Sequence, residues 1–252
     1  MAKSDINRLQ VNDIAEAIGL ITRLPVSASG ERGVDSAWAW PIAGVLVALI
    51  AAIVGLVALA LGLSDGFAAA LILTVMVVTT GAMHEDGLAD CADGFWGGWQ
   101  PARRLEIMKD SRIGTYGVVA LVLSLLARWL LINTLIGADW VAAPLLAAAA
   151  LSRVPMVGLM HWLPSARKGG LSDGTGVPDQ NVLVLAGGVG LLLGLILGGY
   201  ATLLVTAALV AVTFGFGKLA MAKIGGQTGD VLGASQQLAE ITALAIFVAV
   251  AV

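Results

Sequence analysis

The chain is organised around the acid-rich stretch Gly81-Ala82-Met83-His84-Glu85-Asp86-Gly87-Leu88-Ala89-Asp90-Cys91-Ala92-Asp93-Gly94, with long apolar runs before and after it. If residues 86–93 are helical, Asp86, Asp90 and Asp93 fall at positions i, i+4 and i+7 and share one narrow face. Carboxylates that close repel one another unless a cation lies between them. Their oxygens suit Mg²⁺ or Mn²⁺, which usually contact substrate phosphates as well. The pattern predicts a divalent metal site, against the alternatives of a solvated acidic helix start and a Ca²⁺ loop.

Composition indicates a membrane protein. Of the 252 residues, 58% are hydrophobic and only 12% are charged, about half the charged share of a soluble domain. Because lipid tolerates no unpaired backbone polar groups, the predicted class is an all-α polytopic bundle. The single cysteine, Cys91, excludes an internal disulfide, and the net charge of −3 gives no indication of nucleic-acid binding. Residues 1–12 are polar and show no signal peptide.

Hydropathy predicts about seven membrane-crossing helices and one integral membrane catalytic domain over residues 1–252. The apolar runs cover residues 38–63, 67–83, 113–136, 140–163, 182–198, 200–217 and 238–252. The second and the last are short for a full crossing. Within the N-terminal cytoplasmic or interfacial segment, residues 1–36, apolar residues at helical spacing predict a short interfacial helix that stops before Pro25. A second short helix is expected from Pro101, after a loop over residues 95–100.

Basic residues predict the orientation of the bundle. Twelve of the 14 Lys and Arg residues lie in the N-terminal segment and on alternate loops: Lys3, Arg8, Arg23, Arg32, Arg103, Arg104, Lys109, Arg112, Arg167, Lys168, Lys218 and Lys223. The short turns near Asp65, Asp139 and Gly199 contain none. The positive-inside rule therefore places the basic loops, which also carry every polar motif, in the cytoplasm.

Two later loops combine glycine with charge, over residues 166–174 and 225–234. Gly-rich turns expose backbone N–H groups that can hold phosphate oxygens, and Asp230 is a further candidate metal ligand. On its own the second loop is better interpreted as a loop with helix caps. Because both loops lie on the same face as the acids, we expect Asp230 to meet Asp86 and Asp90 in one site, with Lys109, Arg112 and Arg167 around the phosphates.

Other polar residues have two interpretations each. His84 is a general base, a partner of Asp86 or an ordinary helix-end histidine. The basic residues of positions 103–112 bind anionic substrate groups or lipid headgroups. Arg153, inside the fourth apolar run, binds phosphate or pairs with a buried acid such as Glu240, and for Arg128 the ion pair is favoured.

Five segments together resemble the cobalamin synthase family, the adenosylcobinamide-GDP ribazoletransferases. They are Thr22–Pro25, Gly81–Gly94, Met108–Gly114, Ala166–Arg167 with Gly170–Leu171, and Gly226–Asp230 with Gly233–Ala234. The resemblance implies an inner-membrane enzyme of late coenzyme B12 assembly. Such an enzyme joins adenosylcobinamide-GDP to α-ribazole, or its 5′-phosphate, and releases GMP with the help of Mg²⁺. The acidic helix is also similar to that of CDP-alcohol phosphotransferases.

From the residues and the resemblance together we predict a set of functional residues. The predicted catalytic residues are His84, Asp86, Asp110 and Arg112. Substrate contacts are expected from Arg103, Arg104, Lys109, Arg153, Arg167, Thr228 and Gly229. The predicted metal ligands are Glu85, Asp86, Asp90, Asp93 and Asp230. An intramembrane prenyltransferase is the nearest rival enzyme and a transporter the rival of another class, while a homo-oligomer is left open.

Overall fold

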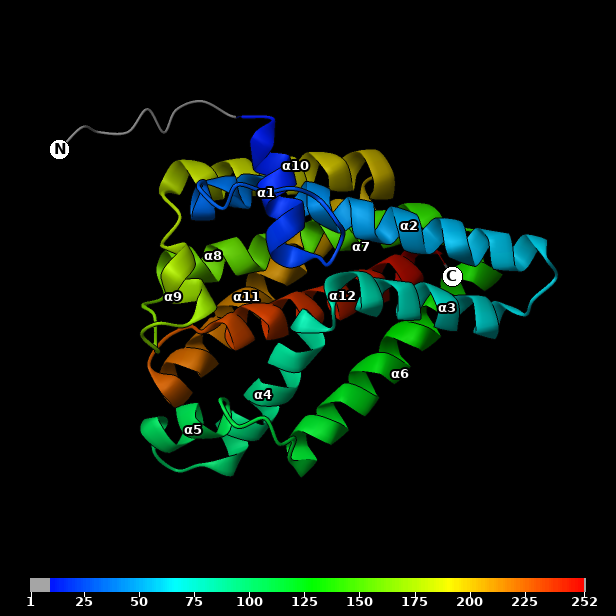
Figure 1. The fold of residues 1–252 in the computed structure, drawn as a ribbon. Helices are drawn as coiled ribbons and strands as arrows, with labels where there is room; N and C mark the ends of the chain where they lie inside the picture. The colour runs from blue at the N-terminus through cyan, green and yellow to red at the C-terminus, as the bar shows by residue number, and fades with distance from the viewer. Residues whose placement is uncertain (1–9, 252) are drawn as a thin grey trace.

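The computed structural model describes residues 10–251, apart from the side chain of Leu171, and over that range it forms an all-α bundle (Figure 1). This confirms the predicted fold class. The elements are α1 (Asn12–Ile21), the 3₁₀ helix η1 (Gly33–Ala39), α2 (Trp40–Ala60), α3 (Asp65–Thr80), α4 (Met83–Gly97), α5 (Pro101–Ile107), α6 (Thr115–Gly137), α7 (Ala142–Leu151), α8 (Val154–Trp162), α9 (Leu171–Thr175), α10 (Gln180–Gly198), α11 (Ala201–Ile224) and α12 (Gly229–Ala251). Lys3 and Arg8, which contribute to the predicted orientation, and Val252 lie outside the described residues.

Six helical segments within residues 10–251 are long and apolar enough to cross a membrane, and a bent pair, α3 with α4, brings the number to as many as seven. The segments are Gly33–Ala60, Thr115–Gly137, Ala142–Trp162, Gln180–Gly198, Ala201–Ile224 and Gly229–Ala251. The predicted second span over residues 67–83 is corrected, because α3 ends at Thr80 and α4 leaves it at 86°. Left-handed backbone at Gly81 (φ 65°) and Ala82 (φ 57°) makes that corner.

The last helix differs most from the prediction. A polar loop was expected over residues 218–237 and an apolar run from 238, but α11 continues to Ile224 and α12 already begins at Gly229. The hydropathy pattern did not indicate that α12 starts at Gly229, because Gln236, Gln237 and Glu240 are polar. They are nevertheless buried inside the bundle, where they have hydrogen-bond partners. The acidic helix is also longer than expected and continues to Gly97, whereas the short helix from Pro101 is confirmed.

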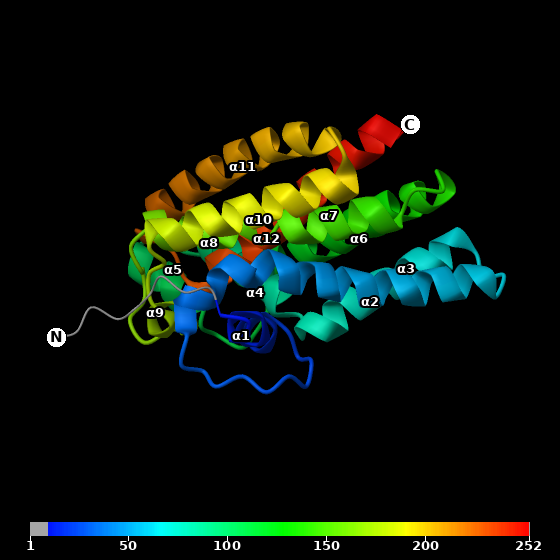
Figure 2. The same cartoon turned by 90° about the horizontal axis from the view of Figure 1, so that it is seen from above.

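Helix α12 runs through the middle of the bundle and contacts α4, α6, α7, α8 and α11. Figure 2 shows the two ends of the molecule. The turns after α2, α6 and α10 gather at one end with the C-terminus, and α5 and α9 lie at the other. The loops that carry the polar motifs therefore share one end, as the charge pattern predicted.

The segment before α2 is fixed by buried acids of α1. The Asp13 carboxylate accepts hydrogen bonds from the Arg32 guanidinium at 2.6 Å and from the Trp38 indole N–H at 2.9 Å. Glu16 accepts from the Gly30 backbone N–H at 2.9 Å. These bonds hold the loop between α1 and η1 against the bundle. The predicted helix before Pro25 is confirmed as α1.

Candidate active site

Helices α4 and α12 touch at glycines. A Cβ atom on Gly87 would lie 2.6 Å from the Asp230 carbonyl oxygen, and one on Gly233 would lie 3.1 Å from the His84 Cα atom. The first distance is too short for a Cβ and the second leaves very little room for one, so the two backbones pack directly against each other. The acidic stretch and the glycine-rich turn, which are far apart in sequence, thus lie in one place, as predicted.

The two glycine-bearing loops are joined by backbone hydrogen bonds. The Gln227 N–H donates to the Pro164 carbonyl at 2.9 Å, and the Ala166 N–H donates to the Gln227 carbonyl at 2.8 Å. This pairing brings the Arg167 guanidinium to the Asp230 carboxylate at 2.9 Å, and the Thr228 hydroxyl donates to the same carboxylate at 3.2 Å. Asp230 is therefore held by its neighbours rather than free in a loop.

Charges converge around Asp90, which is half-buried. Asp230 and Asp86 act on it repulsively and Arg167 attractively, so these four groups form one electrostatic unit. Asp86 is exposed beside it. Within residues 10–251 no three His, Cys, Asp or Glu side chains stand close enough to hold a metal ion on their own. Mg²⁺ is commonly bound by only one or two carboxylates, with water and substrate phosphates as the other ligands. The donor set at Asp86, Asp90 and Asp230 fits that kind of binding.

Asp93 has a different task from the other two aspartates of its helix face. Its carboxylate oxygens accept hydrogen bonds from the backbone N–H groups of Gly114 at 2.7 Å and Gly117 at 2.9 Å. Those N–H groups belong to the start of α6, where a helix has no internal acceptors for them. Both glycines also lack the space for a Cβ against this carboxylate. In the structure Asp93 is thus a helix cap for α6, while its role as a metal ligand stays a prediction.

Glu85 and Arg153 point into a buried polar network rather than to the acidic site. Arg128 binds Glu85 at 2.9 Å and Glu240 at 3.3 Å, and Glu240 also binds Arg153 at 3.1 Å. All four side chains are at most 8% exposed. The favoured ion pair of Arg128 with Glu240 is confirmed. For Arg153 the ion-pair interpretation is the one observed, and the structure does not place its guanidinium among the substrate-binding groups.

Glutamines complete this network, and the sequence interpretation missed them. Gln236 donates to Glu240 at 2.7 Å, and Gln237 donates to Glu85 at 3.2 Å. The spacing of Gln236 and Glu240, four residues apart in an otherwise apolar segment, was the available signal, since such residues share one helix face. Buried polar groups need partners, and the two glutamines of α12 supply part of them, although Glu85 Oε2 and the Nε atoms of Arg128 and Arg153 have no hydrogen-bond partner among the described residues.

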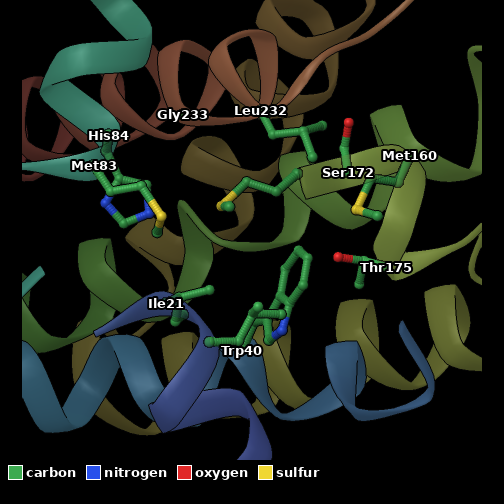
Figure 3. A pocket seen from close by; sticks show the side chains of 12 residues that line it. Ile21, Trp40, Met83, His84, Met160, Ser172, Thr175, Leu232 and Gly233 are labelled. Carbon is green, nitrogen blue, oxygen red and sulfur yellow. The ribbon is translucent and has the colours of Figure 1, made fainter. Parts of the chain in front are cut away.

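His84 lines a small cavity of about 40 Å³ between α4, the turn before α12 and the N-terminal elements. Figure 3 shows its imidazole beside Met83, with Trp40, Met160 and Leu232 on the other walls. The ring is 1% exposed, and its Nε2 atom has no hydrogen-bond partner among the described residues. Gly229 lines the same cavity, so the unpartnered nitrogen lies close to the glycine-rich turn.

The basic residues near α5 fall into two groups: Arg104 binds backbone carbonyls, whereas the others, Arg103, Lys109 and Arg112, are exposed on the surface. Arg104 is structural, because its guanidinium donates to the carbonyls of Gly98 at 2.8 Å and Lys223 at 2.9 Å and so ties α5 to α11. Arg103 pairs with Glu106 on the surface, and the exposed Lys109 follows. Arg112 pairs with Asp110 at 2.8 Å, and this hydrogen bond lowers the pKa of the Asp110 carboxyl.

The fold and the site together define a polytopic membrane protein with an acid-rich, glycine-bordered site at one end of its helical bundle. The chain belongs to the Cobalamin-5-phosphate synthase family, whose family model matches residues 13–248. It is 43% identical over 239 residues to an adenosylcobinamide-GDP ribazoletransferase of Mesorhizobium japonicum, covering 94% of this chain and 92% of the relative. It is 40% identical over 247 residues to the protein of that name from Brucella ovis, covering 93% and 95%. No solved structure matches the chain.

Proposed function

We propose that this protein is an adenosylcobinamide-GDP ribazoletransferase of cobalamin biosynthesis. It joins adenosylcobinamide-GDP to α-ribazole, or to α-ribazole 5′-phosphate, and releases GMP. Family membership over residues 13–248 supports the reaction class. The structural observation that carries the proposal is the direct contact of Gly87 with the Asp230 backbone, because it brings the acids of α4 together with Asp230 and Arg167.

The reaction needs few covalent functions from the protein. A ribazole hydroxyl oxygen forms a bond to the phosphorus on the corrinoid side of the diphosphate. The bond from this phosphorus to the bridging oxygen breaks, GMP leaves with that oxygen, and the hydroxyl proton passes to a base. His84 is the candidate base, because its unpartnered Nε2 atom borders a cavity beside Gly229. Positioning and charge neutralisation then supply most of the catalysis.

Asp86, Asp90 and Asp230 are the residues that would hold Mg²⁺, or Mn²⁺ in its place, together with substrate phosphates. The ion supplies neutralisation of the negative charge that develops on the phosphate oxygens. Arg167 contributes a positive charge from the protein itself, since its guanidinium already lies on Asp230 at 2.9 Å. In this proposal the backbone N–H groups of Thr228 and Gly229 in the glycine-rich turn contact phosphate oxygens.

The active end faces the cytoplasm in this proposal, and the membrane is the inner one. Basic residues on the loops beside the site support that orientation through the positive-inside rule. The soluble nucleotide product is then released on the side where α5 and α9 lie.

The test is a transfer assay with the purified protein in liposomes, supplied with adenosylcobinamide-GDP, α-ribazole and Mg²⁺, with GMP release measured by chromatography. Asp90→Asn keeps the size of the side chain and removes its charge, so we expect kcat to fall by about 10²-fold or more. Asp65→Asn, at the first residue of α3 and so beside the turn after α2 at the other end of the bundle, is the matched control and should keep full activity. Lack of GMP release by the unaltered protein, or full activity of Asp90→Asn, would contradict the proposal.

A further inference from the structure

A surface cleft of about 470 Å³ lies between α5, the end of α4 and the start of α6, and its lining mixes apolar side chains with two arginines and three acids. Figure 1 shows α5 beneath the end of α4 and the connecting chain returning to the foot of α6. Asp93 forms part of the cleft wall. Since Asp93 follows Asp90 by three residues, the cleft begins roughly 4.5 Å farther along the helix axis than the predicted metal carboxylates. The volume is within the range of small-molecule sites, roughly 300–1,000 Å³.

Two arginines on the cleft wall are held only by exposed carboxylates. Arg103 pairs with Glu106 at 2.9 Å with both side chains 66% exposed, and Arg112, which is 86% exposed, pairs with Asp110. Exposed pairs of this kind contribute little free energy. A phosphate group can therefore replace the carboxylate partner of either arginine with a small loss of free energy. It binds the planar guanidinium through two parallel hydrogen bonds.

Tyr116 adds an aromatic surface to the same cleft. It is 53% exposed at the start of α6 and lines the cleft together with Thr115. Stacking of a nucleobase on an exposed aromatic ring contributes about 1–3 kcal/mol. A phosphate-binding pair of arginines beside a stacking ring suits a nucleoside monophosphate better than it suits a bare phosphate.

We propose that this α5 cleft binds the guanosine monophosphate half of the donor, and holds GMP after transfer. The inference rests on the proposed function for the identity of the nucleotide. The donor diphosphate then runs from the cleft past Asp93 to the acids of α4. Gly229 and His84, the candidate base, line a separate cavity that shares no lining residue with the cleft. The cleft thus fixes which phosphorus of the diphosphate lies beside the attacking hydroxyl.

The experiment measures GMP binding by titration calorimetry to the full-length protein in nanodiscs of zwitterionic lipid, without other substrates. The variants are Arg103→Gln, Arg112→Gln and Tyr116→Ala, which change exposed side chains and leave the bundle interior untouched. We expect each to weaken GMP binding by about tenfold and to raise the KM for the donor while the KM for α-ribazole stays constant. Tyr116→Phe keeps the ring and should bind GMP normally. Lys218→Gln, an exposed basic residue of α11 outside the cleft, is the control.

The result that overturns the inference is GMP binding within twofold of the unaltered protein in all three cleft variants. Binding of inorganic phosphate or anionic lipid as tightly as GMP, equally lost in the two arginine variants and unchanged in Tyr116→Ala, would also overturn it in favour of a plain anion site. GMP binding needs no turnover. If the unaltered protein bound GMP through the cleft but released none from the donor, the proposed function would be contradicted, whereas the inference that the cleft binds GMP would be supported.

Discussion

At the scale of single residues, neighbouring aspartates on one helix face have unequal roles. Helical periodicity correctly placed Asp86, Asp90 and Asp93 on one face of α4. It could not show that the start of α6 would lie against Asp93, since that contact joins residues 21 and 24 positions apart through backbone N–H groups. The function of a carboxylate depends on its hydrogen-bond partner. Here the partners are backbone N–H groups, and the only sequence signal for them is the pair of glycines, Gly114 and Gly117.

Asp93→Ala tests this division. Because it removes the acceptor for two N–H groups of α6, we expect it to lower the free energy of unfolding by about 1–2 kcal/mol, as for other helix caps. Mn²⁺ binding, measured by electron paramagnetic resonance on the detergent-solubilised protein, should be unchanged, whereas Asp90→Asn should weaken it. Equal losses of Mn²⁺ binding in both variants would restore Asp93 as a ligand.

Arg128 illustrates the opposite case, in which sequence reasoning found the partner. An arginine inside an apolar helix requires a buried acid, and Glu240 is that acid, with Glu85 as a second one that was not foreseen in this role. Replacing Arg128 by Met leaves both carboxylates buried without their cation. Breaking a buried pair from one side typically costs about 3–5 kcal/mol, so we expect a large drop in the thermal unfolding midpoint. Glu106→Gln, which breaks only an exposed pair, should change the midpoint little.

At the scale of helices, the site depends on how closely α4 approaches α12. Gly87→Ala places a methyl group 2.6 Å from the Asp230 carbonyl oxygen, so the helices must separate, and Gly233→Ala, with its nearest backbone atom at 3.1 Å, has the milder form of the same effect. Overpacking of this kind typically costs about 1–3 kcal/mol, even though alanine favours a helix over glycine. We expect lower stability together with a lower kcat, read from thermal unfolding and GMP release. Gly188→Ala on α10, where a Cβ meets nothing within 4 Å, should preserve both.

Helix ends were the elements least accessible from the sequence. The corner at Gly81–Ala82 was hidden because Thr80 and Met83 continue the apolar pattern, while the chain turns by 86°. The start of α12 was hidden because its polar residues face a buried network. In both places tertiary contacts, which hydropathy does not record, decide where the helix begins.

At the scale of the whole molecule, the segregation of basic loops predicts a fixed orientation. In a Cys91→Ser background, single cysteines at Ala102 and Asp173 should react with an impermeant thiol reagent only after cells are opened. Cysteines at Asp65 and Asp139 should react in intact cells. All four positions are exposed, whereas Ser172 and Gln227, which the sequence also suggests as cytoplasmic reporters, are buried and unsuitable. Labelling at Asp173 from outside would reverse the orientation.

The central place of α12 has a consequence for biosynthesis, because in the chain this helix follows each of the helices that it contacts. Glu85 and Arg128 are 43 residues apart and both precede α12, whereas Glu240 comes 112 residues after Arg128. Until then Arg128 has only one of its two acids, and the acids of α4 have no Asp230 beside them. A nascent chain that stalls before Gly229 therefore lacks Asp230, one of the residues of the proposed site. We expect transfer activity to appear only after α12 has been made, so that chains truncated before Gly229 do not consume the corrinoid substrate.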